Sequence, residues 1–429
     1  MCERLAALKA FLDSAHSVYH AVDFLVQQLE GEGYTLLREN VSWELQPGGK
    51  YYMTRGGSAL VAFRIPAKEP VGFMLSASHA DRPAFKVKKD ELTGGVYTRL
   101  ATEKYGGMLI APWLDRPLSV AGRVIVETQE GISTRLVDID RDLLVIPNVA
   151  ILMNRNANEG QNWNPAVDTL PLIGDEKAAG KFWKLMEQTA GGRILGSDLY
   201  LYLRHNASVW GLDEKYISAQ ALDDLMCAWG CTRGFLQAEE SRAIPVLSVF
   251  DCEEVGSATV QGAGSHLLQD VLTRIAEALE LDLRQLLSNS LMLSADNAHA
   301  KHPNHPELSD STGAPVMNGG VVIKYNANQR YTTDGLSAAL VTKICEDAGV
   351  PVQAYYNRAD LPGGSTLGCI SLAQVTVLSA DIGLAQLAMH SCWETAGAED
   401  ILYLEDAMMA FYSSALEQSG DGLYNICKK

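Results

Sequence analysis

The sequence predicts an α/β fold that is interrupted by an inserted β-rich domain. Apolar runs of strand length alternate with helical patterns in the first 85 residues, and the same rhythm returns from about residue 208. Between residues 86 and 207, short alternating runs with many Gly and Pro residues replace it. A chain of 429 residues is also long enough for two domains. We therefore expect a discontinuous domain over 1–85 and 208–429, and an inserted domain over 86–207.

The first domain is expected to begin with a helix and to continue with strands. Residues 5–31 place apolar side chains at helical spacing, which predicts one amphipathic helix that ends at Gly31-Glu-Gly33. Residues 51–53 and 58–65 predict two strands around a Gly-Gly turn. Residues 71–78 form a continuous apolar run, which is typical of a strand covered on both faces.

The inserted domain and the second half of the chain differ in pattern. In the insertion, a polar loop is expected over 154–171, and strands are expected at 120–127, 134–140, 148–153 and 198–203. Beyond it, alternating patterns predict helices at 221–238, 262–279, 332–348 and 399–417. Between these helices we expect strands at 244–250, 291–295, 320–325 and 375–379.

Composition and charge exclude several classes of function. With 35 basic and 52 acidic residues, the formal net charge is −17, which argues against nucleic acid or an anionic membrane as partner. No apolar run approaches the roughly 18 residues of a membrane-spanning helix. The N-terminal residues are amphipathic and do not resemble a signal peptide, so we expect a cytoplasmic protein. The eight cysteines match neither a zinc ribbon nor a disulfide framework and are expected to be reduced thiols in the core.

Several predicted strands are followed by residue types that bind metal ions. In chain order these residues are His79 and Asp81, Glu253 and Glu254, Asp296 and, after a loop, His390. Because ligands bind at the carboxyl ends of the strands in open α/β sheets, we expect these side chains to meet in one crevice. Imidazole and carboxylate ligands without thiolates favour a hydrolytic zinc or manganese site over a structural zinc site.

The spacing of these residues suggests individual roles. Glu253 and Glu254 follow a strand directly, and such a pair suits a site where one glutamate binds metal and its neighbour moves a proton. In His79-Ala-Asp81 the carboxylate can orient the imidazole. A carboxylate that bridges two metals could come from either residue of the pair Asp223-Asp224, and the spacing alone does not choose between them.

These motifs resemble the aspartyl aminopeptidase-type family of dinuclear zinc aminopeptidases, and the resemblance extends over almost the whole chain. It includes the stretches around His79 and Asp81, Leu222-Asp223, Glu253-Glu254-Val-Gly-Ser257, Ser294 to Asn304, and Met389-His-Ser391. The resemblance implies an open mixed sheet with helices on both faces as the catalytic domain. It also implies that the insertion is a dimerisation domain, and that the chain is a homo-oligomer in which dimers assemble into a dodecamer.

The resemblance also implies which residues bind metal. Two divalent ions are expected, most simply Zn²⁺, with Mn²⁺ or Co²⁺ as alternatives. One ion is expected on His79, Asp223 and Asp296, and the second on Asp223, Glu254 and His390. Asp223 would then bridge the two ions.

The expected reaction is hydrolysis of the N-terminal residue from a peptide with a free N-terminus. By resemblance, a hydroxide held by the two zinc ions attacks the peptide carbonyl, Glu253 acts as general acid and base, and Asp81 orients His79. His299, Lys324 and Tyr331 match positions that line the substrate site.

Some positions depart from the family pattern. Asn148 and Leu152 stand where the family commonly has histidines, Asp224 stands where Asn is common, and Arg82 replaces a serine. None of these removes an expected metal ligand. We expect a preference for N-terminal Asp or Glu, and the departures leave a preference for neutral residues as the alternative.

The sequence leaves two other classes of function to compare with an aminopeptidase. A related dinuclear zinc carboxypeptidase or deacylase would use the same metal ligands but would need a cation for the carboxylate of its substrate. A non-catalytic binding protein on this scaffold would be expected to lack a ligand or the catalytic glutamate, and this sequence has all of them.

Overall fold

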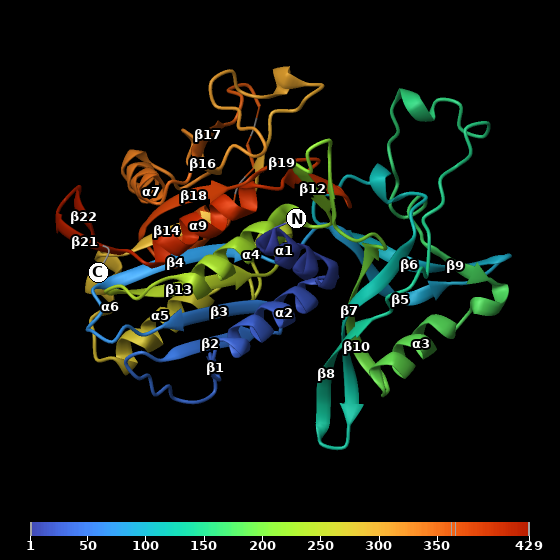
Figure 1. Ribbon diagram of the computed structural model, residues 1–429. Coiled ribbons are helices and arrows are strands. Elements are labelled where there is room, and N and C mark those ends of the chain that lie inside the picture. The colour runs from blue at the N-terminus through green and yellow to red at the C-terminus, as the bar shows by residue number, and fades with distance from the viewer. Residues whose placement is uncertain (1, 362, 365, 428–429) are drawn as a thin grey trace.

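One large sheet organises most of the chain in the computed structural model, which describes residues 2–361, 363–364 and 366–427 (Figure 1). The sheet has nine strands in the order β1-β2-β3-β13-β4-β14-β18-β16-β17. Its central strands β13, β4, β14 and β18 run parallel, whereas β3 is antiparallel to β13 and β16 is antiparallel to β18. This arrangement and the helices that cover it confirm the predicted α/β class with a mixed sheet. In chain order the strands are β1 (Thr35–Leu36), β2 (Lys50–Arg55), β3 (Ala59–Arg64), β4 (Gly72–His79), β13 (Ala243–Phe250), β14 (Leu291–Ala295), β16 (Val321–Tyr325), β17 (Val352–Tyr356) and β18 (Leu378–Gly383).

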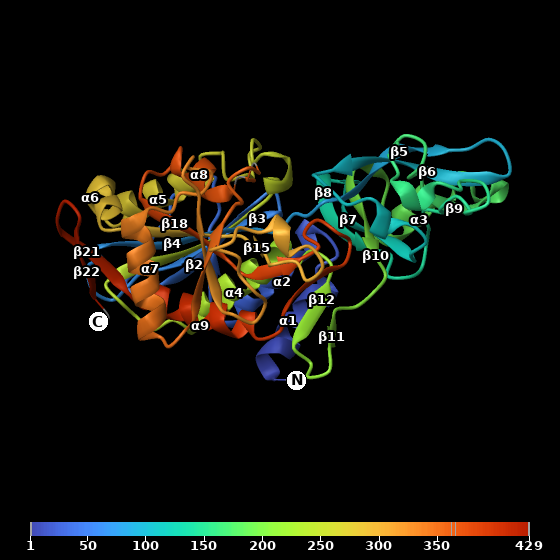
Figure 2. The same ribbon diagram turned by 90° about the horizontal axis from the view of Figure 1, so that it is seen from above.

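Helices cover both faces of this sheet, as the view from above shows (Figure 2). Every residue of β4 and β13 is buried, which explains their continuous apolar sequences. On one face lie α1 (Glu3–Ser14), α2 (Val18–Gly31), α4 (Leu222–Gln237), α7 (Gly335–Asp347) and α9 (Asp400–Tyr412). On the other face lie α5 (Leu267–Ala278), α6 (Leu283–Ser288) and α8 (Leu367–Leu372).

The helix α4 carries part of the site and is held tightly against α9. At Gly234 of α4, a Cβ atom would lie 2.4 Å from the Cβ of Met408, so a larger residue would force the two helices apart. On the other side of α4, the ring of Trp229 stacks on Phe11 of α1, with 5.2 Å between the ring centroids. The apolar packing on both sides fixes the helix whose first turn contains Asp223.

Several predicted elements differ from the structure. The single helix expected over 5–31 is two helices, because Ser17 caps α2 by accepting the backbone N–H of His20. The helix expected over 399–417 ends at Tyr412, and the chain then forms a hairpin of β21 (Ala415–Gly420) and β22 (Leu423–Cys427). Helix α5 begins five residues later than expected, at Leu267, and β18 begins at Leu378.

The expected strand at 148–153 is wrong. The segment forms turns, in which the N–H of Met153 donates to the carbonyl of Ala150 at 2.8 Å. Its apolar side chains point to solvent, with Leu152 79% and Met153 83% exposed. The alternating sequence therefore does not face a core here, which is why periodicity misassigned it.

The inserted segment forms a sheet of its own, in the order β8-β7-β10-β5-β6-β9. Figure 1 shows it beside the large sheet. It has an apolar core of its own. The helix α3 (Lys181–Ala190) packs on it and was not expected from the sequence. The domain limits at 86 and 207 stay a prediction. The strands are β5 (Ala84–Leu92), β6 (Tyr97–Tyr105), β7 (Leu118–Thr128), β8 (Gly131–Asp138), β9 (Leu172–Asp175) and β10 (Ile194–Leu203).

A third sheet lies close to the carboxyl ends of the central strands and has the order β11-β12-β20-β19-β15. Its strands are β11 (Ser208–Trp210), β12 (Tyr216–Ala219), β15 (Ala298–His299), β19 (Ala385–Leu387) and β20 (Glu394–Gly397). Among the described residues, no helix has the length and apolarity needed to cross a membrane.

Strand register places the expected site residues at one edge of the large sheet. Phe250 at the end of β13 pairs with His79 at the end of β4, so the segments that follow the two strands begin side by side. On the other side of β4, Ser294 of β14 pairs with Ala77, so Asp296 also lies at this edge. The parallel centre of the sheet therefore positions three of the sequence motifs together.

Candidate metal centre

The ends of β4 and β13 are joined by the carboxylate of Asp81. The Nδ1 atom of His79 lies 3.2 Å from Asp81 Oδ1, which fixes the imidazole and turns Nε2 toward the crevice. The same carboxylate accepts the backbone N–H groups of Glu253 and Glu254, both at 3.1 Å. Asp81 thus orients a histidine and holds the short 3₁₀ turn (Glu253–Val255) that carries the glutamate pair.

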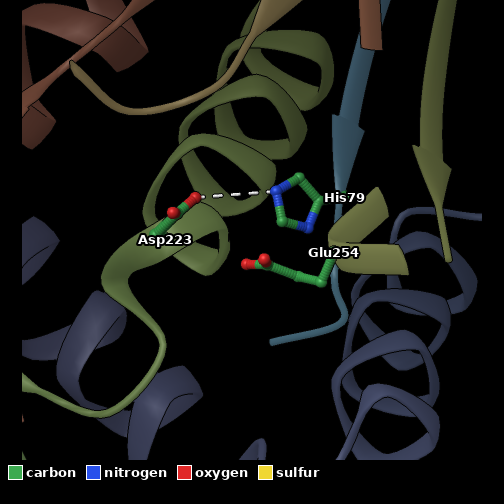
Figure 3. Close-up of side chains that lie close together, drawn as sticks. All are labelled: His79, Asp223 and Glu254. Atoms are coloured by element: carbon green, nitrogen blue, oxygen red, sulfur yellow. Dashed lines mark ion pairs between the residues drawn. The ribbon is translucent and has the colours of Figure 1, made fainter. Parts of the chain in front are cut away.

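Four of the expected metal ligands converge on one point. Figure 3 shows His79, Asp223 and Glu254, whose side chains come from different elements and face one another. His79 Nε2 lies 3.5 Å from Asp223 Oδ1, and His390 Nε2 lies 3.5 Å from Asp223 Oδ2 and 3.3 Å from Glu254 Oε2. Asp223 therefore stands between two histidines, one on each of its oxygens.

The remaining expected ligand, Asp296, follows the end of β14 and approaches Asp223. Ligand oxygens of Asp223, Asp224 and Asp296 all lie within 4.8 Å of one another, as do ligand atoms of His79, Asp223 and Glu254. Asp224 has a different partner as well, since its Oδ2 accepts the backbone N–H of His79 at 3.2 Å. The spacing alone left the choice between Asp223 and Asp224 open and the resemblance implied Asp223, which is the one that lies against both histidines.

The charges in this cluster are poorly balanced by the protein alone. Burial, together with the nearby carboxylates, raises the pKa of Glu253, Glu254 and Asp296 above the ordinary values for such groups. Burial disfavours the charged form of His390, but Asp223 and Glu254 outweigh it and raise the pKa of His390 to about 10.

Three buried carboxylate oxygens in the cluster, Asp223 Oδ1, Asp224 Oδ1 and Glu254 Oε1, have no hydrogen-bond partner. Buried charges and unsatisfied acceptors are costly unless a cation is present. The oxygen and imidazole donors therefore fit a hydrolytic divalent metal ion.

The inserted segment also contributes to this cluster. The hydroxyl of Tyr105, at the end of β6, donates to Asp81 Oδ2 at 2.7 Å. The carbonyl of Gly107 accepts from Nδ1 of His390 at 2.6 Å, which leaves Nε2 of His390 directed at Asp223 and Glu254. The backbone of the inserted segment also passes close to Glu254, since a Cβ at Gly106 would lie 3.1 Å from the Cβ of Glu254. Sequence reasoning missed both contacts, since no local pattern links residues so far apart.

The sequence matches the family model described as aminopeptidase I zinc metalloprotease (M18) over residues 11–412. The chain belongs to the M18 family of zinc aminopeptidases. It is therefore a zinc metallo-aminopeptidase, a hydrolase that acts on peptide bonds, and the resemblance inferred from its motifs is confirmed.

Relatives support the assignment over most of the chain. This aminopeptidase is 40% identical over 421 residues to a probable M18 family aminopeptidase 2 of Clostridium novyi, covering 94% of this chain and 97% of the relative. It is 38% identical over 418 residues to the protein of the same description from Pseudomonas aeruginosa, covering 94% and 97%.

Solved structures show the same fold. A chain from the cryo-EM structure of the Ape4 and Nbr1 complex superimposes with a TM-score of 0.92 at 32% identity, covering 95% of this aminopeptidase and 85% of that chain. The mApe1 dodecamer of S. cerevisiae gives a TM-score of 0.85 at 26% identity, covering 96% of each chain. An M18 aminopeptidase from Thermotoga maritima gives 0.84 at 20% identity, covering 96% and 97%, which supports the fold alone.

The three residues expected to bind substrate differ in their exposure to solvent in this aminopeptidase. His299 is exposed and lines a cavity of about 370 Å³ together with Tyr355 and Gln386. Lys324 is 2% exposed, and its Nζ donates to the carbonyls of Asp296 at 2.6 Å and Asn297 at 3.2 Å.

Tyr331 is buried beside Lys324, with the ammonium 5.3 Å from the centroid of its ring. Lys324 and Tyr331 thus form a buried pair directly behind Asp296, whereas His299 stands at the open side.

Proposed function

We propose that this aminopeptidase holds two divalent metal ions, most simply zinc, with Asp223 bridging them. His79 and Asp296 would complete the first set of ligands, and Glu254 and His390 the second. The observation that carries this proposal is the position of Asp223, with one oxygen 3.5 Å from His79 Nε2 and the other 3.5 Å from His390 Nε2. A carboxylate with a separate imidazole on each oxygen suits a bridge between two cations.

In the proposed reaction, bound metal supplies Lewis acidity that polarises the peptide carbonyl and lowers the pKa of water. Glu253 takes a proton from the attacking water and then returns it to the departing amine. Its raised pKa, caused first by burial, brings the carboxyl closer to the neutral range in which it can both accept and donate a proton. Asp81 acts through His79 and through the backbone of the Glu253 turn, and so fixes the distance between base and cluster.

The substrate is proposed to be a peptide with a free N-terminus and an acidic first residue. Lys324 is the proposed partner of the acidic side chain. The carbonyls of Asp296 and Asn297 take two of the three donors of its ammonium, and a substrate carboxylate would share the third with Asp296 Oδ2, which lies 3.6 Å from Nζ. The burial of this lysine also favours the alternative, a preference for neutral residues, because a substrate would have to reach a group that is 2% exposed.

A set of matched peptides tests activity and preference together. We expect release of N-terminal Asp and Glu with a higher kcat/KM than Leu and Ala, measured with added zinc, manganese or cobalt. Acetylation of the peptide amine should abolish release. Cleavage of the blocked peptides at an undiminished rate would contradict an aminopeptidase of this mechanism and favour a deacylase or carboxypeptidase. Faster release of Leu and Ala than of Asp and Glu would establish the neutral alternative.

The assembly and location belong to the same proposal. We infer that the chain forms a homo-oligomer in which the inserted segment makes dimers and the dimers build a dodecamer in the cytoplasm. The supporting observation is the similarity to the S. cerevisiae mApe1 chain, which is described as a dodecamer. Light scattering on the purified protein should give twelve times the chain mass of 46.6 kDa. A monomer at micromolar concentration would refute the proposed assembly.

A further inference from the structure

One buried carboxylate, outside the expected set of ligands, contacts two of them. Glu394 is the first residue of β20 and is 1% exposed. Its Oε1 accepts the backbone N–H of His390 at 2.6 Å, and its Oε2 accepts the backbone N–H of Asp223 at 2.9 Å. Each oxygen of a single side chain thus holds the backbone of a different expected ligand.

The backbone N–H groups of Asp223 and His390 both need a hydrogen-bond acceptor. Asp223 interrupts the helical geometry of α4, with φ −84° and ψ 108°. His390 has φ 67°, the left-handed region that residues other than glycine rarely adopt. An N–H group in irregular backbone has no partner from a regular helix or strand, and a buried one is costly to leave unpaired. Glu394 supplies the acceptor at both positions.

The carboxylate is itself held by a rigid element. Strand β20 lies between β12 and β19, and Glu394 pairs in register with Ala219 at the end of β12. Ala219 precedes Asp223 by four residues, and β19 ends at Leu387, shortly before His390. The sheet therefore sets where Glu394 stands relative to both chain segments that bring the ligands to the cluster.

We propose that Glu394 is a positioning residue of the metal centre, which sets the separation of Asp223 and His390 through their backbone N–H groups. This inference rests on the proposed function, in which those two residues bind metal. Because Glu394 holds the backbone of the bridging residue, its loss is expected to loosen both metal positions. Residues that orient metal ligands from behind typically change metal affinity 10- to 100-fold when removed.

Two variants test this role, Glu394→Ala and Glu394→Gln. The glutamine keeps the shape of the side chain but has one acceptor oxygen, and its NH₂ group would face an N–H donor. We expect zinc affinity, measured by competition with a chromogenic chelator, to fall roughly 10- to 100-fold in both variants. The visible absorption spectrum of the cobalt-substituted protein should also change, since it reports the geometry of the ligands. If the alanine variant does not fold, the glutamine variant alone tests the positioning role.

The chain provides a matched control in Asp400. This residue is also fully buried, and its two oxygens accept the backbone N–H groups of Asn318 at 2.7 Å and Gly320 at 3.0 Å. None of these partners is an expected ligand. Asp400→Asn should lower thermal stability while zinc affinity and the cobalt spectrum stay as in the parent protein.

Two results separate the failure of this inference from that of the proposed function. Parent-like zinc affinity and cobalt spectrum in a folded Glu394 variant would overturn the positioning role and leave the metal centre standing. A parent protein that binds no zinc would instead refute the proposed function.

Discussion

At the scale of single residues, Glu253 has the most specific of the proposed roles. Its backbone N–H donates to Asp81. Its carboxyl lies in the electrostatic field of His79, Asp223 and Asp296, but Glu253 is not one of the expected metal ligands. Glu253→Gln keeps the size of the side chain but cannot accept a proton. We expect turnover to fall about 10²- to 10⁴-fold, while the metal content, measured by elemental mass spectrometry, stays unchanged.

The control for this variant is Glu277→Gln, an exposed position on α5. It should leave both turnover and metal content as in the parent protein. Near-native turnover of the Glu253 variant would show that another group moves the proton.

A second residue-scale prediction concerns stability and pH. Burial raises the pKa of Asp400 to about 7, although the N–H groups of Asn318 and Gly320 oppose this. The unfolded chain has a pKa of about 3.9 for this group, so the folded protein binds the proton more tightly. Its contribution to stability is complete below about pH 4 and is lost as the pH rises to about 7, at up to about 1.4 kcal/mol per pH unit.

Asp400→Asn removes this titration. Chemical unfolding between pH 4.5 and 7.5, at constant zinc, should show a weaker fall of stability with rising pH in the variant than in the parent. Equal slopes in the two proteins would contradict the raised pKa.

At the scale of elements, the segment that follows β6 links the inserted sheet to the metal cluster. Tyr105 donates to Asp81, Gly107 accepts from His390, and the N–H of Leu109 donates to the carbonyl of His390 at 3.0 Å. The inserted sheet therefore takes part in orienting two expected site residues, in addition to any part in assembly.

Tyr105→Phe tests this link, because it removes only the hydroxyl. A hydrogen bond to a charged group contributes about 1.5–3 kcal/mol, so we expect kcat/KM to fall about tenfold or more. The control is Tyr200→Phe, whose ring packs edge-on against Tyr105 at 5.6 Å between centroids. This control should keep kcat/KM within about twofold, as expected for a change that leaves Asp81 and its hydrogen bonds intact. An equal loss in both variants would point to packing and not to the hydrogen bond.

Elements with a local signal were predicted well, and those held by distant contacts were not. Strands β4, β13 and β14 have buried apolar sequences, and the metal-binding types follow their ends directly. The same sequence does not show that Glu394 reaches Asp223, or that Gly107 reaches His390, because these contacts depend on the way the sheets assemble. The end of one helix and the start of the next around Ser17, and the turn at 148–153, were missed for a related reason. Periodicity reveals neither a helix cap nor the absence of a core for apolar side chains to pack against.

At the scale of the whole molecule, bound metal should be part of the stability of the catalytic unit. The cluster joins α4, the ends of β4 and β14, the turn after β13 and the loop before β20, and its acidic groups repel one another when no cation is present. A ligand that binds only the folded protein stabilises it by about 2.7 kcal/mol at a concentration of 100 times its Kd.

We therefore expect the melting temperature to fall on treatment with a chelator and to recover with zinc. Differential scanning fluorimetry measures this directly, and magnesium, which prefers all-oxygen octahedral sites, serves as the control ion. Identical melting curves with chelator and with zinc would argue against metal as a structural part of the folded molecule.

The proposed mechanism depends above all on Asp223 as the residue shared by two metal ions. Zinc can be counted per chain by elemental mass spectrometry in the parent protein and in Asp223→Ala, after dialysis against the same zinc buffer. We predict two equivalents of zinc in the parent and loss of both in the variant. Circular dichroism should show that the variant keeps its fold. Two equivalents still bound to Asp223→Ala would contradict the bridge and, with it, the proposed mechanism.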